Sequence, residues 1–370
     1  MIVSLQFEKK PLLFEKPVSL ITTKDPSSLE QCFCKMEQAL KSGYYLAGFL
    51  SYEAGYYFEK CLWQDKKYDF PLIYMGVYGP PKHTAPKIFA ASKAVSLKNL
   101  RLNISKEKYF ENIEIIREHI RKGDVYQITY CLKLLFDACG SLPDLYARLL
   151  KEQPVPYPAY IESDDFHILS LSPEKFLKKQ DKFIITKPMK GTWMRGRTFA
   201  SDVVERLRFG RDHKNRAENV MIADLLRNDL GRLGQGIAAP RLFEITGYKT
   251  LFQMTSTVTA TLPQDISLYQ LFASLFPSGS VTGAPKIRAM EIIRGLEQEE
   301  RHIYTGAIGY IAPNKDLFFN IPIRTLLIQN GRGEMGIGGG IVWDSSPLGE
   351  WNEGLLKARF VTETFGPAYP

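Results

Sequence analysis

A lysine and a glutamate in neighbouring Pro- and Gly-punctuated segments are the residues best suited to covalent chemistry. Lys190 stands in the segment ITKPMKGT (185–192), and Glu174 precedes it in SPEKF (172–176). A buried lysine can lose its proton near neutral pH and become an amine nucleophile. A carboxylic acid beside it can then protonate a leaving group. The pair predicts covalent catalysis; the alternative is an exposed loop lysine, as most lysines of a chain this basic would be.

A second group of carboxylates has the spacing of a metal site. Glu350 and Glu353 stand three residues apart, which places both on one face of a helix. Glu218 is a third candidate, and oxygen ligands without a His or Cys cluster favour Mg²⁺. The alternative is a solvated helix face. The glycine run 338–340 just before Glu350 favours the site, because strand glycines can let a backbone approach a ligand.

Two glycine-rich segments resemble nucleotide-binding motifs without meeting their requirements. The segment GRGEMG (331–336) matches G-x-G-x-x-G, but a strand-like run follows it instead of a helix. We therefore interpret it as a turn between strands. The segment GSVTGAPK (279–286) lacks the P-loop spacing, yet its backbone can approach an anion closely.

The elements that must position these residues are of mixed type. Apolar residues at helical spacing predict a helix over 106–122, ended by Gly123 and followed by a strand-like run at 125–130. A second helix is expected over 215–230, closed by Gly231. Strands are expected at 158–171, 181–187, 249–261, 303–312, 316–328 and 334–343. The pattern predicts an α+β fold with hairpin-length loops and no parallel βαβ alternation.

Length and composition describe an ordinary globular chain. Its 370 residues, 45% hydrophobic and 24% charged, can form one large domain or two associated ones, with a loop or linker at 79–97. We expect no secretory signal and no membrane partner, because the apolar stretch 44–52 is too short to span a bilayer. Five cysteines without CxxC pairs indicate reduced thiols and a cytoplasmic location. The net charge of +8 is dispersed, so no nucleic-acid partner is expected.

Several motifs in one order resemble a known family over about residues 105–360. They are GDVYQIT, LSPEKF, KPMKGT, NRAENVMIADLLRNDLGRL, GSVTGAPK, YTGAIGYI, IPIRT and GGGIVWDSSPLGEWNE. This set resembles the chorismate-utilising enzymes, the family of anthranilate synthase component I; the first hundred residues resemble it more weakly, through GFLSYE. The resemblance implies two large antiparallel sheets packed together with helices outside. Residues 1–100 would form the N-terminal part and 101–365 the chorismate-binding catalytic region of one interleaved domain.

The resemblance also implies a ligand set. Glu218 and Glu353 match the Mg²⁺ ligand positions of the family, with Glu350 beside them, and the metal would hold the ring carboxylate of chorismate. Arg324 matches the arginine that grips a substrate carboxylate, a task suited to its bidentate geometry. The anion cradle would be completed by backbone amides around Gly339, Gly340, Thr282 and Gly283.

Within the family, the chain most resembles the aminodeoxychorismate synthase component I branch. Lys190 stands where anthranilate synthases have alanine; in this branch the lysine is thought to attack the ring and expel the 4-hydroxyl, leaving a covalent adduct that ammonia displaces. Glu174 matches the acid proposed to protonate that hydroxyl. Gln127 fills the substrate-side position where water-using isochorismate and salicylate synthases carry a lysine base, which favours ammonia. Gln253 replaces a histidine that anthranilate synthase associates with pyruvate loss, so we expect a separate lyase to perform elimination.

The resemblance thus implies Mg²⁺-dependent amination of chorismate to 4-amino-4-deoxychorismate, the first step toward p-aminobenzoate and folate. No G-x-C-x-G nucleophile turn is present, so ammonia would come from solution or from a separate glutamine amidotransferase subunit. Anthranilate synthase component I is the main alternative, opposed by Lys190 and Gln253; isochorismate synthase is opposed by Gln127. A catalytically silent chorismate-binding protein is a further alternative, although every candidate catalytic position holds a competent residue.

Overall fold

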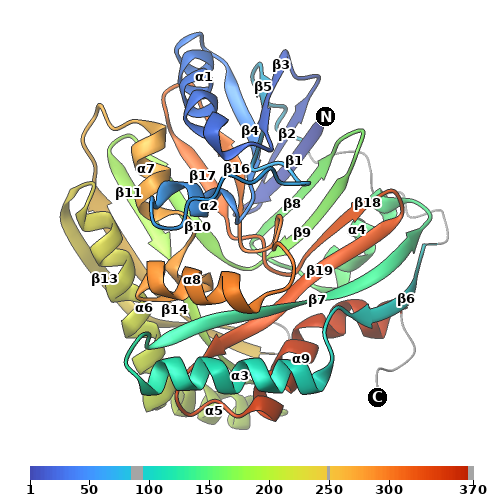
Figure 1. Cartoon of the computed structure of the whole chain (residues 1–370), viewed down its shortest axis with the longest axis vertical. Coiled ribbons are helices and arrows are strands. Elements are labelled where there is room, and N and C mark those ends of the chain that lie inside the picture. Colours follow the sequence, from blue (N-terminus) through green and yellow to red (C-terminus); the bar gives the residue numbers. More distant parts are fainter. Residues whose placement is uncertain (85–94, 248–250, 366–370) are drawn as a thin grey trace.

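The computed structural model describes residues 1–84, 95–247 and 251–365. Within these residues the strands form a nine-stranded sheet (sheet A) and a ten-stranded sheet (sheet B), and neighbouring strands pair antiparallel. Figure 1 shows the sheets with helices on their outer sides. The predicted α+β class with two large antiparallel sheets is confirmed.

Sheet A is assembled from both ends of the chain. Its strands, in spatial order, are β15 (Gly283–Ala284), β7 (Gln127–Cys139), β19 (Arg332–Ile341), β18 (Thr325–Gln329), β9 (His167–Ser172), β8 (Tyr157–Glu162), β1 (Ile2–Phe7) and β2 (Lys10–Glu15), with β6 (Ser96–Leu102) also paired to β7. The long pair β7 and β19 runs above α3 and α9 in Figure 1.

Sheet B also combines early and late strands. Its order is β12 (Met189–Met194), β14 (Leu251–Thr261), β11 (Phe183–Lys187), β10 (Lys175–Gln180), β17 (Leu317–Asn320), β16 (Ala307–Ile311), β4 (Tyr45–Leu50), β5 (Ile73–Tyr78) and β3 (Ser19–Thr23), with β13 (Gln235–Gly247) paired to β14.

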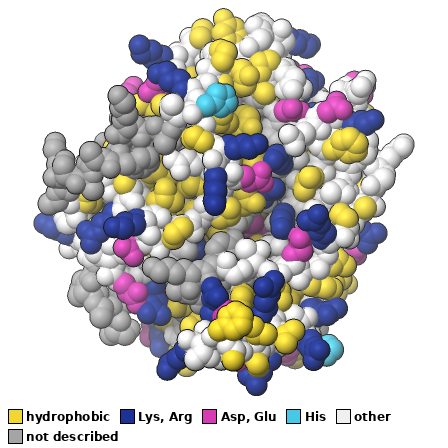
Figure 2. All heavy atoms as spheres, turned by 180° about the vertical axis from the view of Figure 1, so that it is seen from behind, with side chains coloured by type: hydrophobic (Ala, Val, Ile, Leu, Met, Phe, Trp, Pro, Cys, Tyr) yellow, Lys and Arg dark blue, Asp and Glu magenta, His cyan; other side chains and the backbone are white. Residues whose placement is uncertain are grey.

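The described helices cover the outer faces of the sheets. They are α1 (Leu29–Lys41), α2 (Ala54–Phe58), α3 (Lys106–Arg121), α4 (Leu142–Glu152), α5 (Phe199–Arg211), α6 (His213–Gly231), α7 (Leu268–Leu275), α8 (Lys286–Leu296) and α9 (Pro347–Phe365), with short 3₁₀ turns at Pro26–Ser28 and Gly279–Val281. None of these helices has the length and apolar character needed to cross a membrane. On the face in Figure 2, Lys and Arg side chains are spread among apolar and acidic ones.

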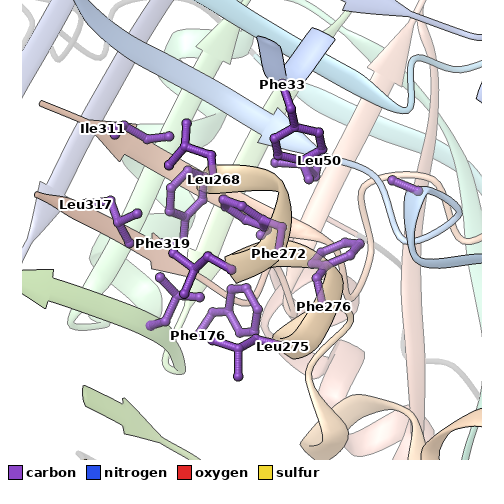
Figure 3. Packing of buried hydrophobic residues seen from close by; sticks show 14 of the residues in the cluster. Phe33, Leu50, Phe176, Leu268, Phe272, Leu275, Phe276, Ile311, Leu317 and Phe319 are labelled. Carbon is purple, nitrogen blue, oxygen red and sulfur yellow. The ribbon is translucent and has the colours of Figure 1, made fainter. Parts of the chain in front are cut away.

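Three apolar clusters explain the layering. One lies between the sheets, where Phe7 of β1 meets Phe318 of β17 with ring centroids 4.9 Å apart. A second joins sheet A to α3, α4, α8 and α9, and a third joins sheet B to α1, α6 and α7. In the third, Phe272 of α7 packs edge-to-face on Phe319 of β17 at 5.3 Å (Figure 3). Each such buried ring contributes about 1.5–3 kcal/mol of burial free energy.

Local chemistry explains the two helices predicted from periodicity. The Ser105 hydroxyl accepts the Lys108 amide at the start of α3, and Gly123, with φ +79°, follows its end. Asp212 caps α6 in the same way by accepting the Asn215 amide at 2.8 Å. The second helix therefore begins two residues earlier than expected, and Gly231 is its last residue instead of its stop.

Several strand predictions need correction. The expected strand 158–171 is a hairpin of β8 and β9, turned at Ser163, whose amide donates to the Phe166 carbonyl at 3.0 Å. The expected strand 316–328 is interrupted at 321–324, where the chain leaves sheet B for sheet A. Pro322 has no amide hydrogen to continue a ladder, and Arg324 has φ +52°. GRGEMG (331–336) opens no helix, as predicted, but only Gly331 lies in the turn, because residues 332–336 already belong to β19.

Other expected segments are longer, shorter or outside the described residues. The strand-like run at 125–130 is the beginning of β7, which extends to Cys139. Residues 249 and 250, and 85–94 of the expected linker, lie outside the described residues, while Ser96 and Leu97 already belong to β6. The first hundred residues contribute β1, β2 and β6 to sheet A and β3 to β5 to sheet B.

Candidate active site

Lys190 is held near the beginning of β12, beside the N-terminal part of α6. Gly191 follows it with φ +89°, and an added Cβ atom there would lie 2.6 Å from Asn215 Oδ1. Glycine is therefore required both by the backbone angle and by the closeness of α6. The Lys190 ammonium forms no hydrogen bond or ion pair with any residue that the structure describes. Burial lowers its pKa, while Glu218 and Glu174 oppose that change.

A buried amide and a side-chain-free strand position surround the Lys190 amine. An added Cβ atom on Gly340 would lie 3.2 Å from Lys190 Nζ and 2.2 Å from Gln127 Nε2. The Gln127 side chain is fully buried, yet neither its oxygen nor its nitrogen has a hydrogen-bond partner among the residues that the structure describes. Buried amides are normally satisfied, so an unpartnered one beside a free amine is what a polar ligand site requires.

The loop at 279–284 packs against the beginning of β7 and brings Thr282 and Gly283 to Gln127. Thr282 is fully buried, and its carbonyl accepts the Thr129 amide at 2.7 Å. Gly283 pairs with Ile128 in the β15–β7 ladder, and an added Cβ atom would lie 2.2 Å from the Gln127 carbonyl oxygen. Only glycine permits this approach. The structure therefore places both predicted loop residues beside Gln127.

Glu174 occupies the corner where the chain passes from β9 of sheet A to β10 of sheet B. Its backbone carbonyl accepts the Ile321 amide at 3.0 Å, and the Ser172 hydroxyl bonds to the Ile321 carbonyl at 2.5 Å. Residues 321–324 form the return crossing from sheet B to sheet A. Two chain crossings are thus joined at Glu174, which fixes its backbone.

Arg324 belongs to the same return crossing. Its carbonyl accepts the Leu171 amide at 3.0 Å, and its side chain is half-buried. The structure therefore brings the backbone of the predicted carboxylate-binding arginine to the crossing that Glu174 occupies.

The Glu174 side chain is an acid in a nearly dry environment, with 3% of its surface exposed. Burial raises its pKa to about 7, although the Ser280 hydrogen bond and the Lys190 charge favour the ionised form. The Ser280 hydroxyl donates to Glu174 Oε1 at 2.7 Å. A carboxyl group with this pKa can exchange a proton near neutral pH.

The two carboxylates of α9 converge on β19 at Gly339. An added Cβ atom there would lie 3.0 Å from Glu350 Oε2 and 3.4 Å from Glu353 Oε1. Burial raises the pKa of Glu350, which accepts the Ser345 hydroxyl at 2.6 Å. The Lys357 ammonium, 2.8 Å from Glu353 Oε1, lowers the pKa of Glu353.

Glu218 of α6, the third predicted carboxylate, interacts electrostatically with Lys190 and Glu353. Burial raises its pKa, the Lys190 ammonium lowers it, and the negative charge of Glu353 raises it again. Carboxylates that disfavour each other's charge are the kind of donor set that Mg²⁺ binds. Across residues 1–84, 95–247 and 251–365, no three His, Cys, Asp or Glu side chains already form a metal-holding group. Three carboxylates are suitable ligands for Mg²⁺. The cation that lies beside Glu353 in this structure is the Lys357 ammonium.

Two residues of this site were missed by sequence reasoning. Lys357 donates to the Gly338 carbonyl at 2.6 Å and pairs with Glu353; its i, i+4 spacing from Glu353 was the available signal. Ser280 lies in the recognised GSVTGAPK segment, but its partner Glu174 is 106 positions away. Gln253 is buried in β14 opposite Thr192, and no residue in the described part of the chain hydrogen-bonds to its Oε1. Its effect on elimination stays a prediction.

Known proteins resemble this chain in sequence over most of its length. Residues 6–363 match the family described as chorismate binding enzyme. The probable chloroplastic aminodeoxychorismate synthase of Oryza sativa subsp. japonica is 40% identical over 282 residues, covering 74% of this chain and 31% of that protein. Aminodeoxychorismate synthase component 1 of Klebsiella aerogenes is 37% identical over 261 residues, covering 70% of this chain and 58% of that protein.

A solved structure shares the fold. Anthranilate synthase component I from Streptococcus pneumoniae TIGR4 superposes with a TM-score of 0.81 at 22% identity, covering 97% of this chain and 92% of the other. The matches to the two curated relatives cover less than two thirds of their lengths. Since the family match takes in nearly all of the sequence, the protein belongs to the chorismate binding enzymes.

Proposed function

We propose that this protein aminates chorismate with ammonia to give 4-amino-4-deoxychorismate, the precursor of p-aminobenzoate in folate synthesis. The observation that carries the proposal is a Lys190 amine and a Gln127 amide that have no partner among the described residues, in one site with Glu174, whose pKa is about 7. The names of the curated relatives, aminodeoxychorismate synthase, favour the same reaction.

Lys190 and Glu174 would divide the first half of the reaction. The neutral Lys190 amine forms a C–N bond to the ring while the bond to the 4-hydroxyl breaks, and Glu174 gives its proton to that hydroxyl, which leaves as water. Ammonia then forms the new C–N bond at position 4 and releases the Lys190 amine. The product ammonium returns one proton to Glu174, so chorismate and ammonia become aminodeoxychorismate and water.

Gln127 is suited to receive the ammonia. Its side-chain oxygen is an unpartnered acceptor, and ammonia can donate to it while its lone pair points at the ring. A neutral amide does not remove a proton from water as a lysine base would. This chemistry favours ammonia over water as the second nucleophile.

Substrate anchoring would fall to the glycine strand, Arg324 and the carboxylates. Glu218, Glu353 and Glu350 would hold Mg²⁺, which supplies a cationic partner for the ring carboxylate when bound. Arg324 and the backbone around Gly340 and Thr282 would hold the remaining anionic groups.

A separate glutamine amidotransferase subunit is the proposed source of ammonia, in keeping with the designation component 1 of the Klebsiella aerogenes relative. The five cysteines form no disulfide, which fits an enzyme of the reducing cytoplasm. Gln253 in place of histidine is proposed to leave pyruvate elimination to another enzyme.

Product analysis tests this function. Purified protein is incubated with chorismate, Mg²⁺ and ¹⁵N-labelled ammonium at mildly alkaline pH, and the products are identified by mass. Aminodeoxychorismate with one ¹⁵N atom and no free pyruvate is expected. Anthranilate with pyruvate, or isochorismate, would contradict the proposal.

A further inference from the structure

Both hydrogen bonds to the Glu174 carboxyl end on one of its two oxygens. Oε1 accepts the Ser280 hydroxyl at 2.7 Å and the Met189 amide at 3.2 Å. No residue in the described part of the chain hydrogen-bonds to Oε2. Ser280 is 4% exposed and Glu174 3%, so bulk water does not compete for these bonds.

This asymmetry decides where the acid can carry its proton. A protonated carboxyl group has one O–H donor and one oxygen that only accepts. A proton on Oε1 would require the Ser280 bond to reverse and would leave the Met189 N–H facing a hydroxyl oxygen, a weaker acceptor than a carbonyl oxygen. The neutral acid therefore keeps Oε1 as its acceptor and carries the proton on Oε2.

The Ser280 bond to Glu174 also orients the neighbouring hydroxyl of Ser278. Ser278 Oγ lies 3.0 Å from Ser280 Oγ, and it also accepts the Ser280 amide at 3.4 Å. Since Ser280 gives its hydroxyl hydrogen to Glu174, the Ser278 hydroxyl supplies the hydrogen between the two serines. The buried row Ser278–Ser280–Glu174 thus has one consistent direction.

We infer that Ser280 is a positioning residue that holds the acidic proton of Glu174 on Oε2, the oxygen left free to protonate the leaving hydroxyl. This inference rests on the proposed function and deepens it, because it assigns a role to a residue outside the predicted catalytic pair. The charge of Lys190 on β12 favours the ionised form of the Glu174 carboxyl, as the hydrogen bond from Ser280 also does.

The variants Ser280→Ala and Ser280→Thr test the inference, with Ser274→Ala as the control. Ser274 donates to the Asp229 carbonyl on the outer side of sheet B. Ser280→Ala should lower kcat about tenfold, a fraction of what a general acid contributes, with little change in the KM for chorismate. Ser280→Thr, which keeps the hydroxyl, should recover most of the rate. An Ala variant with the wild-type rate would overturn the inference.

A pH readout separates positioning from mere packing. The Ser280 bond stabilises the carboxylate, so its loss should raise the pKa of Glu174 by roughly one unit. The pH above which activity falls should rise accordingly in Ser280→Ala. An equal loss of rate at all pH values would point to a structural role and reject the inference.

Infrared spectroscopy measures the pKa of Glu174 without requiring turnover. The protonated carboxyl band of Glu174, assigned by its absence in Glu174→Gln, should persist to higher pH in Ser280→Ala than in wild type. If wild type makes another product but the band shifts, the proposed function fails and the proton placement is supported. An unmoved band overturns the placement whatever the product.

Discussion

Lys190 Nζ lies 3.2 Å from the point where a Cβ atom on Gly340 would stand. The amine on β12 of sheet B therefore meets a part of β19 in sheet A that presents only backbone. Gln127 of β7 closes the same space from the neighbouring strand. A nucleophile, an unpartnered amide and a bare backbone thus meet where the two sheets approach, which is the arrangement that the proposed amination requires.

Replacing Lys190 should abolish most amination while leaving substrate binding measurable. In Lys190→Ala we expect kcat to fall by at least about 10²-fold, because the covalent route is lost, while chorismate still binds to the other groups. Steady-state kinetics and calorimetric titration with chorismate measure the two effects. Lys187→Ala is the matched control, since Lys187 lies on the same segment as Lys190 but pairs with Glu244 of β13. Equal rates for Lys190→Ala and its control would contradict the covalent role.

Adding a methyl group at Gly340 should damage the site more than the fold. The new Cβ atom would overlap Gln127 Nε2 and crowd Lys190 Nζ, so Gln127 must move from its buried position. We expect kcat/KM to fall at least roughly tenfold, since small displacements of reacting groups are costly. Gly295→Ala in α8 meets no atom within 4 Å and should gain about 0.5–1 kcal/mol of stability. Full activity of Gly340→Ala would show that this strand position faces no ligand.

The buried Glu174 carboxyl should make stability depend on pH with a defined sign. Burial raises its pKa from the ordinary 4.5 to about 7, so folding favours the protonated form. Its contribution is fully present below pH 4.5 and is lost as pH rises through about 7. Glu174→Gln should therefore gain stability relative to wild type between pH 5 and 8, by about 3 kcal/mol at most.

Urea unfolding of Glu174→Gln and of wild type, at pH 5 and at pH 8, measures the difference in their free energies of unfolding. Glu53 is also buried with its pKa raised to about 7, so the wild-type curve alone cannot assign the effect, but the difference between variant and wild type can. A variant whose stability relative to wild type is the same at pH 5 and pH 8 would refute a raised pKa at Glu174.

Mg²⁺ should compete with the Lys357 ammonium for Glu353. We expect Mg²⁺ to raise the melting temperature of the wild type, and Glu353→Gln to weaken Mg²⁺ binding at least roughly tenfold. Lys357→Met should strengthen it by removing the competing charge. Glu363→Gln is the control, because Glu363 lies on the same helix but pairs with Arg359. Identical Mg²⁺ responses of Glu353→Gln and Glu363→Gln would place the metal elsewhere.

Sequence reasoning succeeded where the signal is local. Helix α3 was predicted because its apolar spacing and Gly123 lie within one stretch of chain. The single strand expected at 158–171 was wrong because the polar run 162–165, a local turn signal, was not taken into account. Pro322 was a local signal against a continuous strand at 316–328, but the passage of the chain from sheet B to sheet A depends on pairing with distant strands.

The features of the site also fall into those that a local sequence signal predicts and those that depend on distant parts of the chain. Lys190, Glu174 and Gln127 could be proposed as site residues because recognisable motifs surround them. The bond from Ser280 to Glu174 joins segments 106 positions apart, so its existence depends on the crossing of the two sheets. The pKa of Glu174 likewise follows from burial by distant strands.

Trapping the covalent adduct tests the central claim most directly. Protein with chorismate and Mg²⁺ but no ammonia is quenched and digested, and its peptides are weighed and sequenced by mass spectrometry. The account predicts that the peptide containing Lys190 gains the mass of chorismate less one water, and that ammonium added before the quench removes this gain. Amination that proceeds while Lys190 stays unmodified, or an adduct on another lysine, would contradict it.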